Sequence, residues 1–101
     1  MGLRISNMPK QLLWATIRVP DNPRVRFFVK SPKGKQGYED VTSRVAKLVI
    51  EQADDDSGAC ELLRFDKDGK LVWKTRHLSL QETKWHVEFE YGLPEEKWTA
   101  V

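Results

Sequence analysis

Apolar and polar positions alternate along two short segments near the start of the chain, which is the pattern of half-buried β-strands. Residues 11–19 place an apolar side chain at every second position from Leu13 to Val19. Residues 24–30 alternate in the same way, and the intervening Pro-Asp-Asn-Pro segment at 20–23 has the composition of a turn. The two segments therefore predict a β-hairpin. The outward side of its second strand carries Arg24, Arg26, Phe28 and Lys30.

The apolar period changes from two to that of a helix after a polar loop at 31–37. From Val41 to Val49 the apolar residues recur at i, i+4, i+7 and i+8, the stripe of an amphipathic helix. Asp40 is suited to cap its N-terminus. We predict a helix that continues to about residue 52 or 53, followed by an acidic loop that ends at Gly58.

The second half of the chain returns to strand patterns. Residues 59–65 and 71–78 flank the turn sequence Asp-Lys-Asp-Gly-Lys at 66–70, a strong hairpin signal. Residues 85–91 then alternate apolar and polar positions, and Gly92 and Pro94 end that strand. Residues 1–10 are interpreted as a loose lead-in and 93–101 as a C-terminal tail.

Two registers compete for the hairpin around Gly69. A two-residue loop would place Leu63 opposite Lys74. A three-residue loop with Gly69 in the left-handed conformation keeps one face apolar, and it is the one we predict. Its expected pairs are Phe65 with Leu71 and Leu63 with Trp73.

These elements, in the order ββαβββ, predict a single α+β domain with one helix packed on a mainly antiparallel five-stranded sheet. The cations Lys74 and Arg76 are expected to face Glu88 and Glu90 across neighbouring strands. The expected core contains Leu13, Ile17, Phe27, Val45, Leu48, Leu63, Trp73, Val87 and Phe89.

Composition limits the class of protein. A chain of 101 residues is too short for two independent cores. With 40% hydrophobic and 32% charged residues, it is too apolar for a disordered chain and too charged for a membrane protein. The single cysteine, Cys60, excludes an intrachain disulfide and fits a reducing compartment. We therefore expect a cytoplasmic protein without a membrane partner.

Charge is divided between the two halves of the chain. Residues 1–50 carry ten Lys or Arg and three acids, a net charge of +7, whereas residues 51–101 carry seven and twelve, a net charge of −5. Strands from the two halves could pair and neutralise each other. The alternative is a dipolar molecule with a basic patch that meets an acidic or phosphate-bearing partner.

Residues suited to catalysis or metal binding are few. A site would need His77, His86 and Cys60 to converge, and three N or S ligands do not complete a structural zinc site. We interpret His77 as lying at a sheet end and Cys60 as a small buried hydrophobe. The Asp66-x-Asp68 spacing lacks the later ligands of a calcium loop. We expect no enzyme activity, cofactor or metal.

The basic strand and loop at 24–35 give the most substantive surface signal. Cations neutralise phosphates and an exposed aromatic ring stacks on a base, the combination found in single-stranded nucleic-acid binders. Trp14 also falls on the side of the first hairpin away from the expected core, where an exposed Trp could anchor a protein partner. The candidate binding residues are Trp14, Arg24, Arg26, Phe28, Lys30, Lys33 and Lys35.

The leading hypothesis is a small non-enzymatic protein-interaction module whose partner is another protein or a second copy of the chain. It depends on the number of aromatic residues, which exceeds what one helix can cover, and on the missing catalytic motifs. The alternative is a module that binds single-stranded RNA or DNA through residues 24–35.

Overall fold

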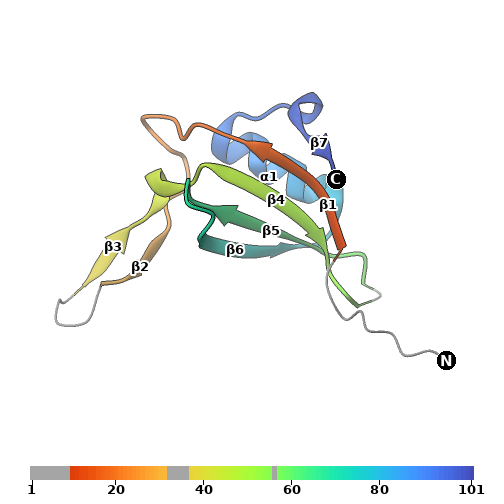
Figure 1. Cartoon of the computed structure of the whole chain (residues 1–101), viewed down its shortest axis with the longest axis horizontal. Coiled ribbons are helices and arrows are strands. Elements are labelled where there is room, and N and C mark those ends of the chain that lie inside the picture. Colours follow the sequence, from red (N-terminus) through yellow and green to blue (C-terminus); the bar gives the residue numbers. More distant parts are fainter. Residues whose placement is uncertain (1–9, 32–36, 56) are drawn as a thin grey trace.

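A computed structural model describes residues 10–31, 37–55 and 57–101. The strands are β1 (Lys10–Thr16), β2 (Phe28–Lys30), β3 (Tyr38–Asp40), β4 (Lys47–Gln52), β5 (Cys60–Phe65), β6 (Leu71–His77) and β7 (Thr99–Ala100), and the helices are α1 (Leu80–Tyr91) and two 3₁₀ turns, Thr42–Arg44 and Glu95–Lys97. Five strands form an antiparallel sheet of order β6-β5-β4-β1-β7, and β2 and β3 form a separate ribbon (Figure 1). Helix α1 packs on one face of the sheet. The predicted α+β class is confirmed.

The predicted helix at 41–53 is wrong, because this segment contains the 3₁₀ turn and the central strand β4. Leu48 and Ile50 are fully buried under α1, and Val49 between them is buried on the opposite face. A strand covered on both faces reads as a continuous apolar run, which matches a helical stripe equally well. Pairing with β1 on one side and β5 on the other decides for the strand.

The predicted strand at 85–91 is also wrong, because these residues form most of α1. The Ser79 side chain accepts a hydrogen bond from the backbone N–H of Glu82, which caps the helix N-terminus. At the other end Gly92 adopts φ 69°, and its N–H donates to the carbonyl of Glu88. The Ser-x-x-Glu sequence at 79–82 is a helix start signal that the strand prediction did not take into account.

The alternation at 85–91 corresponds to two stripes on opposite sides of α1. Val87 and Tyr91 are four residues apart and pack into the core. Trp85 and Phe89 are also four residues apart and lie on the outer side, 65% and 52% exposed. A period of two therefore arose from two helical i, i+4 pairs.

The predicted hairpin between residues 11–19 and 24–30 is wrong in its pairing. β1 pairs with β4 and β7, and β2 pairs with β3. The inward and outward sides of the second segment are nevertheless confirmed. Phe27 is buried, whereas its neighbours Arg26 and Phe28 are exposed.

The β5–β6 hairpin is confirmed, with a register that combines both alternatives. Gly69 adopts φ 82°, and Phe65 lies opposite Leu71 as predicted. A bulge between Arg64 and Phe65 then shifts the ladder, so Leu63 lies opposite Lys74 rather than Trp73. One extra residue at a bulge moves every later side chain along the partner strand.

The core lies between α1 and the sheet, and its buried cluster comprises Val45, Leu48, Ile50, Cys60, Leu62 and Val87. Of the expected core residues, Leu13 and Ile17 pack against this cluster. Leu63 lies in register with Val49 on the other face, and Phe89 is exposed, so these two assignments are wrong. Trp73 is half-buried and its ring centroid lies 5.4 Å from that of Phe27.

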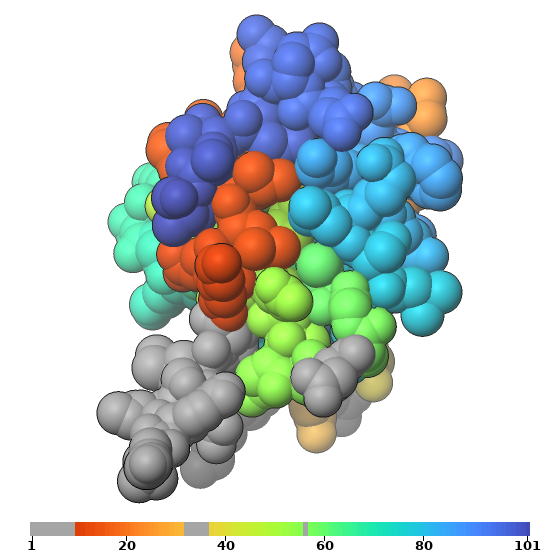
Figure 2. All heavy atoms as spheres, turned by 90° about the vertical axis from the view of Figure 1, so that its right-hand side faces the viewer, coloured from red at the N-terminus to blue at the C-terminus, as the bar shows by residue number. Residues whose placement is uncertain are grey.

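Residues 93–101 return to the sheet, where β7 pairs with β1 (Figure 2, dark blue beside red). The expected cross-strand pairs with Glu88 and Glu90 do not form, because those acids are in α1. Lys74 instead pairs with Glu61 at 3.5 Å and Arg76 with Asp55 at 2.7 Å. No helix within the described ranges is long and apolar enough to cross a membrane.

Candidate functional site

A cleft of about 490 Å³ lies between α1, the edge strand β6 and the segment that leads into β2. We call it the α1 cleft. The surface that its lining residues expose to the cleft is predominantly apolar. These residues are Val25, Phe27, Thr75, His77, Glu82, Trp85, His86, Phe89 and Glu90. Five of these nine side chains come from α1, so the helix is the main wall.

Helical spacing places the α1 residues of the cleft in two adjacent rows. Glu82, His86 and Glu90 follow one another at i, i+4 and i+8 and form one row that lines the cleft. Trp85 and Phe89 form the outer row. The cleft thus has a polar inner row and an aromatic rim.

A buried ion pair lies beneath the cleft. Arg64 Nη2 donates to both carboxylate oxygens of Glu90 at 3.0 and 2.9 Å, and Nη1 donates to Thr75 Oγ1 at 3.0 Å. The guanidinium also lies 4.5 Å from the ring centroid of Phe27. Arg64 is fully buried and Glu90 is 6% exposed. Each charge therefore has its partner inside the protein, as buried charges require.

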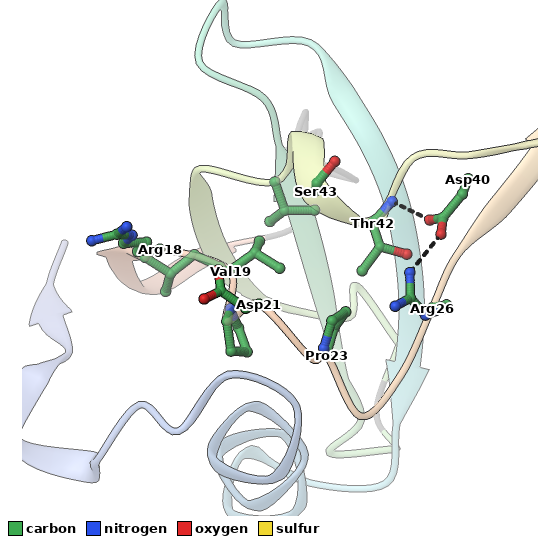
Figure 3. A pocket seen from close by; sticks show the side chains of 11 residues that line it. Arg18, Val19, Asp21, Pro23, Arg26, Asp40, Thr42 and Ser43 are labelled. Carbon is green, nitrogen blue, oxygen red and sulfur yellow. Dashed lines mark hydrogen bonds and ion pairs between the residues drawn. The ribbon is translucent and has the colours of Figure 1, made fainter.

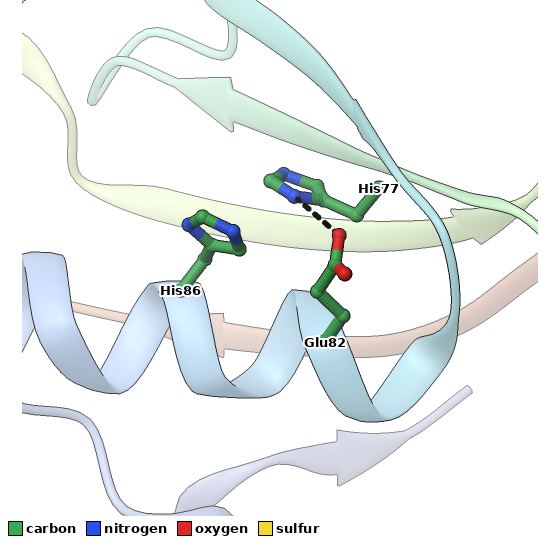
Figure 4. Close-up of side chains that lie close together, drawn as sticks. All are labelled: His77, Glu82 and His86. Atoms are coloured by element: carbon green, nitrogen blue, oxygen red, sulfur yellow. Dashed lines mark ion pairs between the residues drawn. The ribbon is translucent and has the colours of Figure 1, made fainter.

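Two histidines meet at one end of the cleft (Figure 4). The ring centroids of His77 and His86 are 4.5 Å apart, and His77 Nδ1 lies 3.9 Å from Glu82 Oε1. The other ring nitrogen of His77, Nε2, is 2.8 Å from Thr75 Oγ1. Burial, followed by the nearby His86 and Arg64, lowers the pKa of His77, so its ring is neutral at neutral pH.

The interpretation of Cys60 as a small buried hydrophobe is confirmed. Its side chain belongs to the core cluster, and burial raises the pKa of the thiol. His77 is the last residue of β6 and lies opposite Cys60 in the ladder, so its predicted place at a sheet end is confirmed too. The sequence reasoning missed Glu82, whose spacing of four residues from His86 is the signal that could have identified it.

The structure separates the candidate binding residues instead of gathering them. Trp14 is half-buried on the sheet face away from α1, with Lys47 Nζ 5.2 Å from its ring centroid. Arg24 lies over the Phe89 ring at 5.2 Å, at the rim of the α1 cleft. Arg26 pairs with Asp40, while Phe28 and Lys30 are exposed on the ribbon. Lys33 and Lys35 lie outside the described residues, and so does the lead-in predicted at 1–10 except for Lys10, which begins β1.

The β2–β3 ribbon presents two aromatic rings on one face. Phe28 lies opposite Asp40 and Lys30 lies opposite Tyr38, so these four side chains share a side. Phe28 is 48% and Tyr38 75% exposed. The ribbon therefore carries an aromatic and lysine-bearing surface distinct from the α1 cleft.

A second hollow, of about 460 Å³, lies where the ribbon joins the sheet (Figure 3). Polar groups on one side of it bind one another: Asp40 accepts from the Thr42 N–H at 2.9 Å and from Arg26 at 2.8 Å. The buried Thr42 hydroxyl accepts from the Phe27 N–H at 2.7 Å. Hydrogen bonding by Thr42, and then the Arg26 ion pair, lowers the pKa of Asp40. These bonds attach the β2–β3 ribbon to the sheet, so we assign this hollow a structural role.

The two oppositely charged halves of the chain form no ion pairs with each other among the described residues. Each ion pair between described residues joins two partners from the same half of the chain, such as Arg26 with Asp40 or Lys84 with Glu95. The described cations of the first half are therefore not neutralised by direct pairs with described acids of the second.

No family model, curated protein or solved structure matches this chain.

Proposed function

We propose that this protein is a small non-enzymatic protein-interaction module and that the α1 cleft is its binding surface. The observation that carries the proposal is the aromatic rim formed by Trp85 and Phe89, which are both more than half exposed beside an apolar hollow. Aromatic side chains contribute much of the binding energy of protein interfaces, because they bury a large area at a low cost in conformational entropy.

The proposed occupant is an extended segment of a partner protein with an apolar side chain next to an acidic one. The apolar walls of the cleft fit the first. The second is suggested by Arg24, whose guanidinium lies over Phe89 and forms no ion pair with any described residue. A carboxylate beside the bound apolar group would meet that cation at the rim.

A non-enzymatic role is supported by the state of the single cysteine, because a buried thiol with a raised pKa is a poor nucleophile. The inner charges Arg64 and Glu90 already bind each other. The proposed location is the cytoplasm, where a free thiol is stable.

Selection from a display library of short random peptides tests this proposal. We expect selected peptides to combine an apolar anchor with Asp or Glu. Their binding should be lost in Trp85→Ala and Phe89→Ala and weakened in Arg24→Ala. Truncation of a central aromatic anchor typically costs at least about 2 kcal/mol of binding energy. Leu78→Ala is the matched control, because Leu78 is 78% exposed and does not line the cleft.

Peptides that bind Trp85→Ala and the unaltered protein equally well would overturn the choice of surface. Sedimentation of the protein alone tests the other occupant, a second copy of the chain. A dimer that Trp85→Ala converts to a monomer would replace the peptide partner by self-association.

A second candidate function is favoured by the exposed rings of Phe28 and Tyr38 beside Lys30 on the ribbon. These residues suit single-stranded RNA or DNA, whose bases stack on aromatic rings. The affinity for a mixed-sequence oligonucleotide should then fall with salt, by about 0.7 in log K per unit of log salt for each phosphate contact. Phe28→Ala should lose about 1–3 kcal/mol of binding energy. An affinity that is independent of salt would exclude this candidate.

A further inference from the structure

We propose that His77, Glu82 and His86 form a binding site for one divalent transition-metal ion, with Zn²⁺ as the ligand that best fits the donor set. The metal-binding atoms of these three side chains all lie within 4.8 Å of one another. Two imidazoles and one carboxylate are a set found at zinc sites that keep a fourth position open. The metal site lies in the same α1 cleft as the proposed peptide site, but its three ligands are not the residues on which the peptide proposal depends, which are Trp85, Phe89 and Arg24.

The geometry requires only a small closure. Tetrahedral ligands at about 2.0–2.2 Å from one zinc ion lie about 3.3–3.6 Å apart. His77 Nδ1 and Glu82 Oε1 are 3.9 Å apart, so a small side-chain movement brings this pair into range. The exposed His86 supplies the movement that remains, because its side chain lies on the surface of α1.

The site is built by one short piece of chain. His77 ends β6, and the Ser79 cap turns the chain directly into α1. Glu82 and His86 then follow one helical turn apart and lean toward His77 (Figure 4). The end of β6, the Ser79 cap and the first two turns of α1 follow one another directly, so they bring the three ligands together without a long loop.

A polar neighbour orients the buried ligand. When Nδ1 of His77 holds a metal, Nε2 carries the proton and donates to Thr75 Oγ1, 2.8 Å away. The Thr75 hydroxyl also accepts from Arg64, which holds it in place. Such a hydrogen bond from the second ring nitrogen is the usual support of a metal-binding histidine.

Glu82 has a second role that the test must separate from metal binding. Its Oε1 accepts from the Leu78 N–H at 3.1 Å and so helps to hold the start of α1. Glu82→Gln keeps an oxygen acceptor for that N–H and removes the anionic ligand. His86→Gln removes a ligand from an exposed position. Both variants are therefore expected to fold.

Calorimetric titration of the untagged full chain with Zn²⁺ tests the proposal, and Co²⁺ absorption in the visible range reports the coordination. We expect one ion per chain and a higher melting temperature with Zn²⁺. His86→Gln and Glu82→Gln should each weaken Zn²⁺ binding by at least about tenfold. Even substitutions of residues that only hydrogen-bond to a metal ligand typically reduce metal affinity by that factor. Thr75→Ala should weaken it about 10–100-fold, and Thr75→Ser should restore it.

Glu88→Gln is the matched control, because Glu88 is an exposed acid of the same helix outside the cluster. It should leave Zn²⁺ affinity unchanged. Cys60→Ala should also leave it unchanged. The proposal is overturned by the absence of both heat and thermal stabilisation, by binding that survives His86→Gln and Glu82→Gln, or by binding that requires Cys60. None of these results bears on peptide binding at Trp85 and Phe89.

Discussion

At the scale of single residues, the unusual feature is a fully buried arginine in a chain of this size. Arg64 points into the space between β5, β6 and α1, where Glu90 and Thr75 accept its hydrogen bonds. The desolvation of two charges offsets much of their attraction. The pair therefore determines how α1 sits on the sheet more than it adds to total stability.

Removing one member of this pair should be costly. Glu90→Gln should lower the free energy of unfolding by about 3–5 kcal/mol, because it leaves the Arg64 charge buried without a counter-ion. Urea denaturation measures this loss, and Glu88→Gln on the exposed side of α1 should change stability by less than about 0.5 kcal/mol. A loss below about 1 kcal/mol is typical of an ion pair exposed to water and would contradict the burial of Arg64 and Glu90.

Tyr91 gives a prediction for alkaline pH. Its hydroxyl is buried without a hydrogen-bond partner, and burial raises its pKa from 10.0 to about 12. As pH rises, Tyr91 loses its proton in the unfolded chain before it does so in the folded protein. The free energy of unfolding is therefore unaffected by this group below pH 10 and falls as pH rises from 10 to about 12. Tyr91→Phe should reduce the alkaline fall in melting temperature. Tyr38→Phe, which alters an exposed ring, should leave it in place.

At the scale of elements, β4 and α1 determine the architecture. β4 is paired on both sides and contributes Leu48 and Ile50 to the core. α1 covers that core with Val87 and presents Trp85 and Phe89 on its outer side. The sheet covers only one of the two apolar sides of α1. The other side, with Trp85 and Phe89, stays exposed, and for this reason the α1 cleft is the proposed binding surface.

The central place of β4 predicts a large effect at Leu48. Leu48→Ala should cost about 2–5 kcal/mol, the usual range for emptying a buried leucine site. Chemical denaturation of this variant beside Leu78→Ala provides the comparison, since Leu78 is 78% exposed and should lose less than about 0.5 kcal/mol. Equal losses at the two leucines would contradict the burial of β4.

At the scale of the whole molecule, the chain divides into a covered sheet and a thin ribbon (Figure 1). The ribbon has three ladder pairs and is attached through buried Phe27 and Thr42. The sheet has four paired interfaces and the helix above it. Stability should therefore be distributed unevenly, because a two-stranded ribbon alone is marginal in water.

Amide hydrogen exchange should show this difference. The amides of β4 and β5 should exchange only through global unfolding, whereas those of β2 and β3 should exchange through local opening at a lower free energy. Mild denaturant should accelerate exchange in the sheet more than in the ribbon, because global unfolding exposes more surface. Equal protection in both parts would show that the ribbon is not an independent opening unit.

The sequence by itself determined the elements whose signals are local. The β5–β6 hairpin follows from the turn chemistry around Gly69, and the sides of residues 24–30 follow from their alternation. The fold class was predicted although the helix was expected at 41–53 and a strand at 85–91, because these two errors exchange one helix for one strand. Of the candidate site, the sequence identified His77, His86 and Arg24 as residues of interest but did not place any two of them together.

The tertiary structure alone decided which apolar runs became strand and which became helix. The run through Leu48 and the alternation through Val87 each fit a helix and a strand. Pairing with β1 and β5 made the first a strand. Packing of Val87 on the sheet, together with the local Ser79 cap, made the second a helix. The same choice placed Trp85 and Phe89 outside and brought Glu82 and His86 to His77. When a pattern of apolar residues fits both the helical and the strand period, long-range contacts decide which element forms.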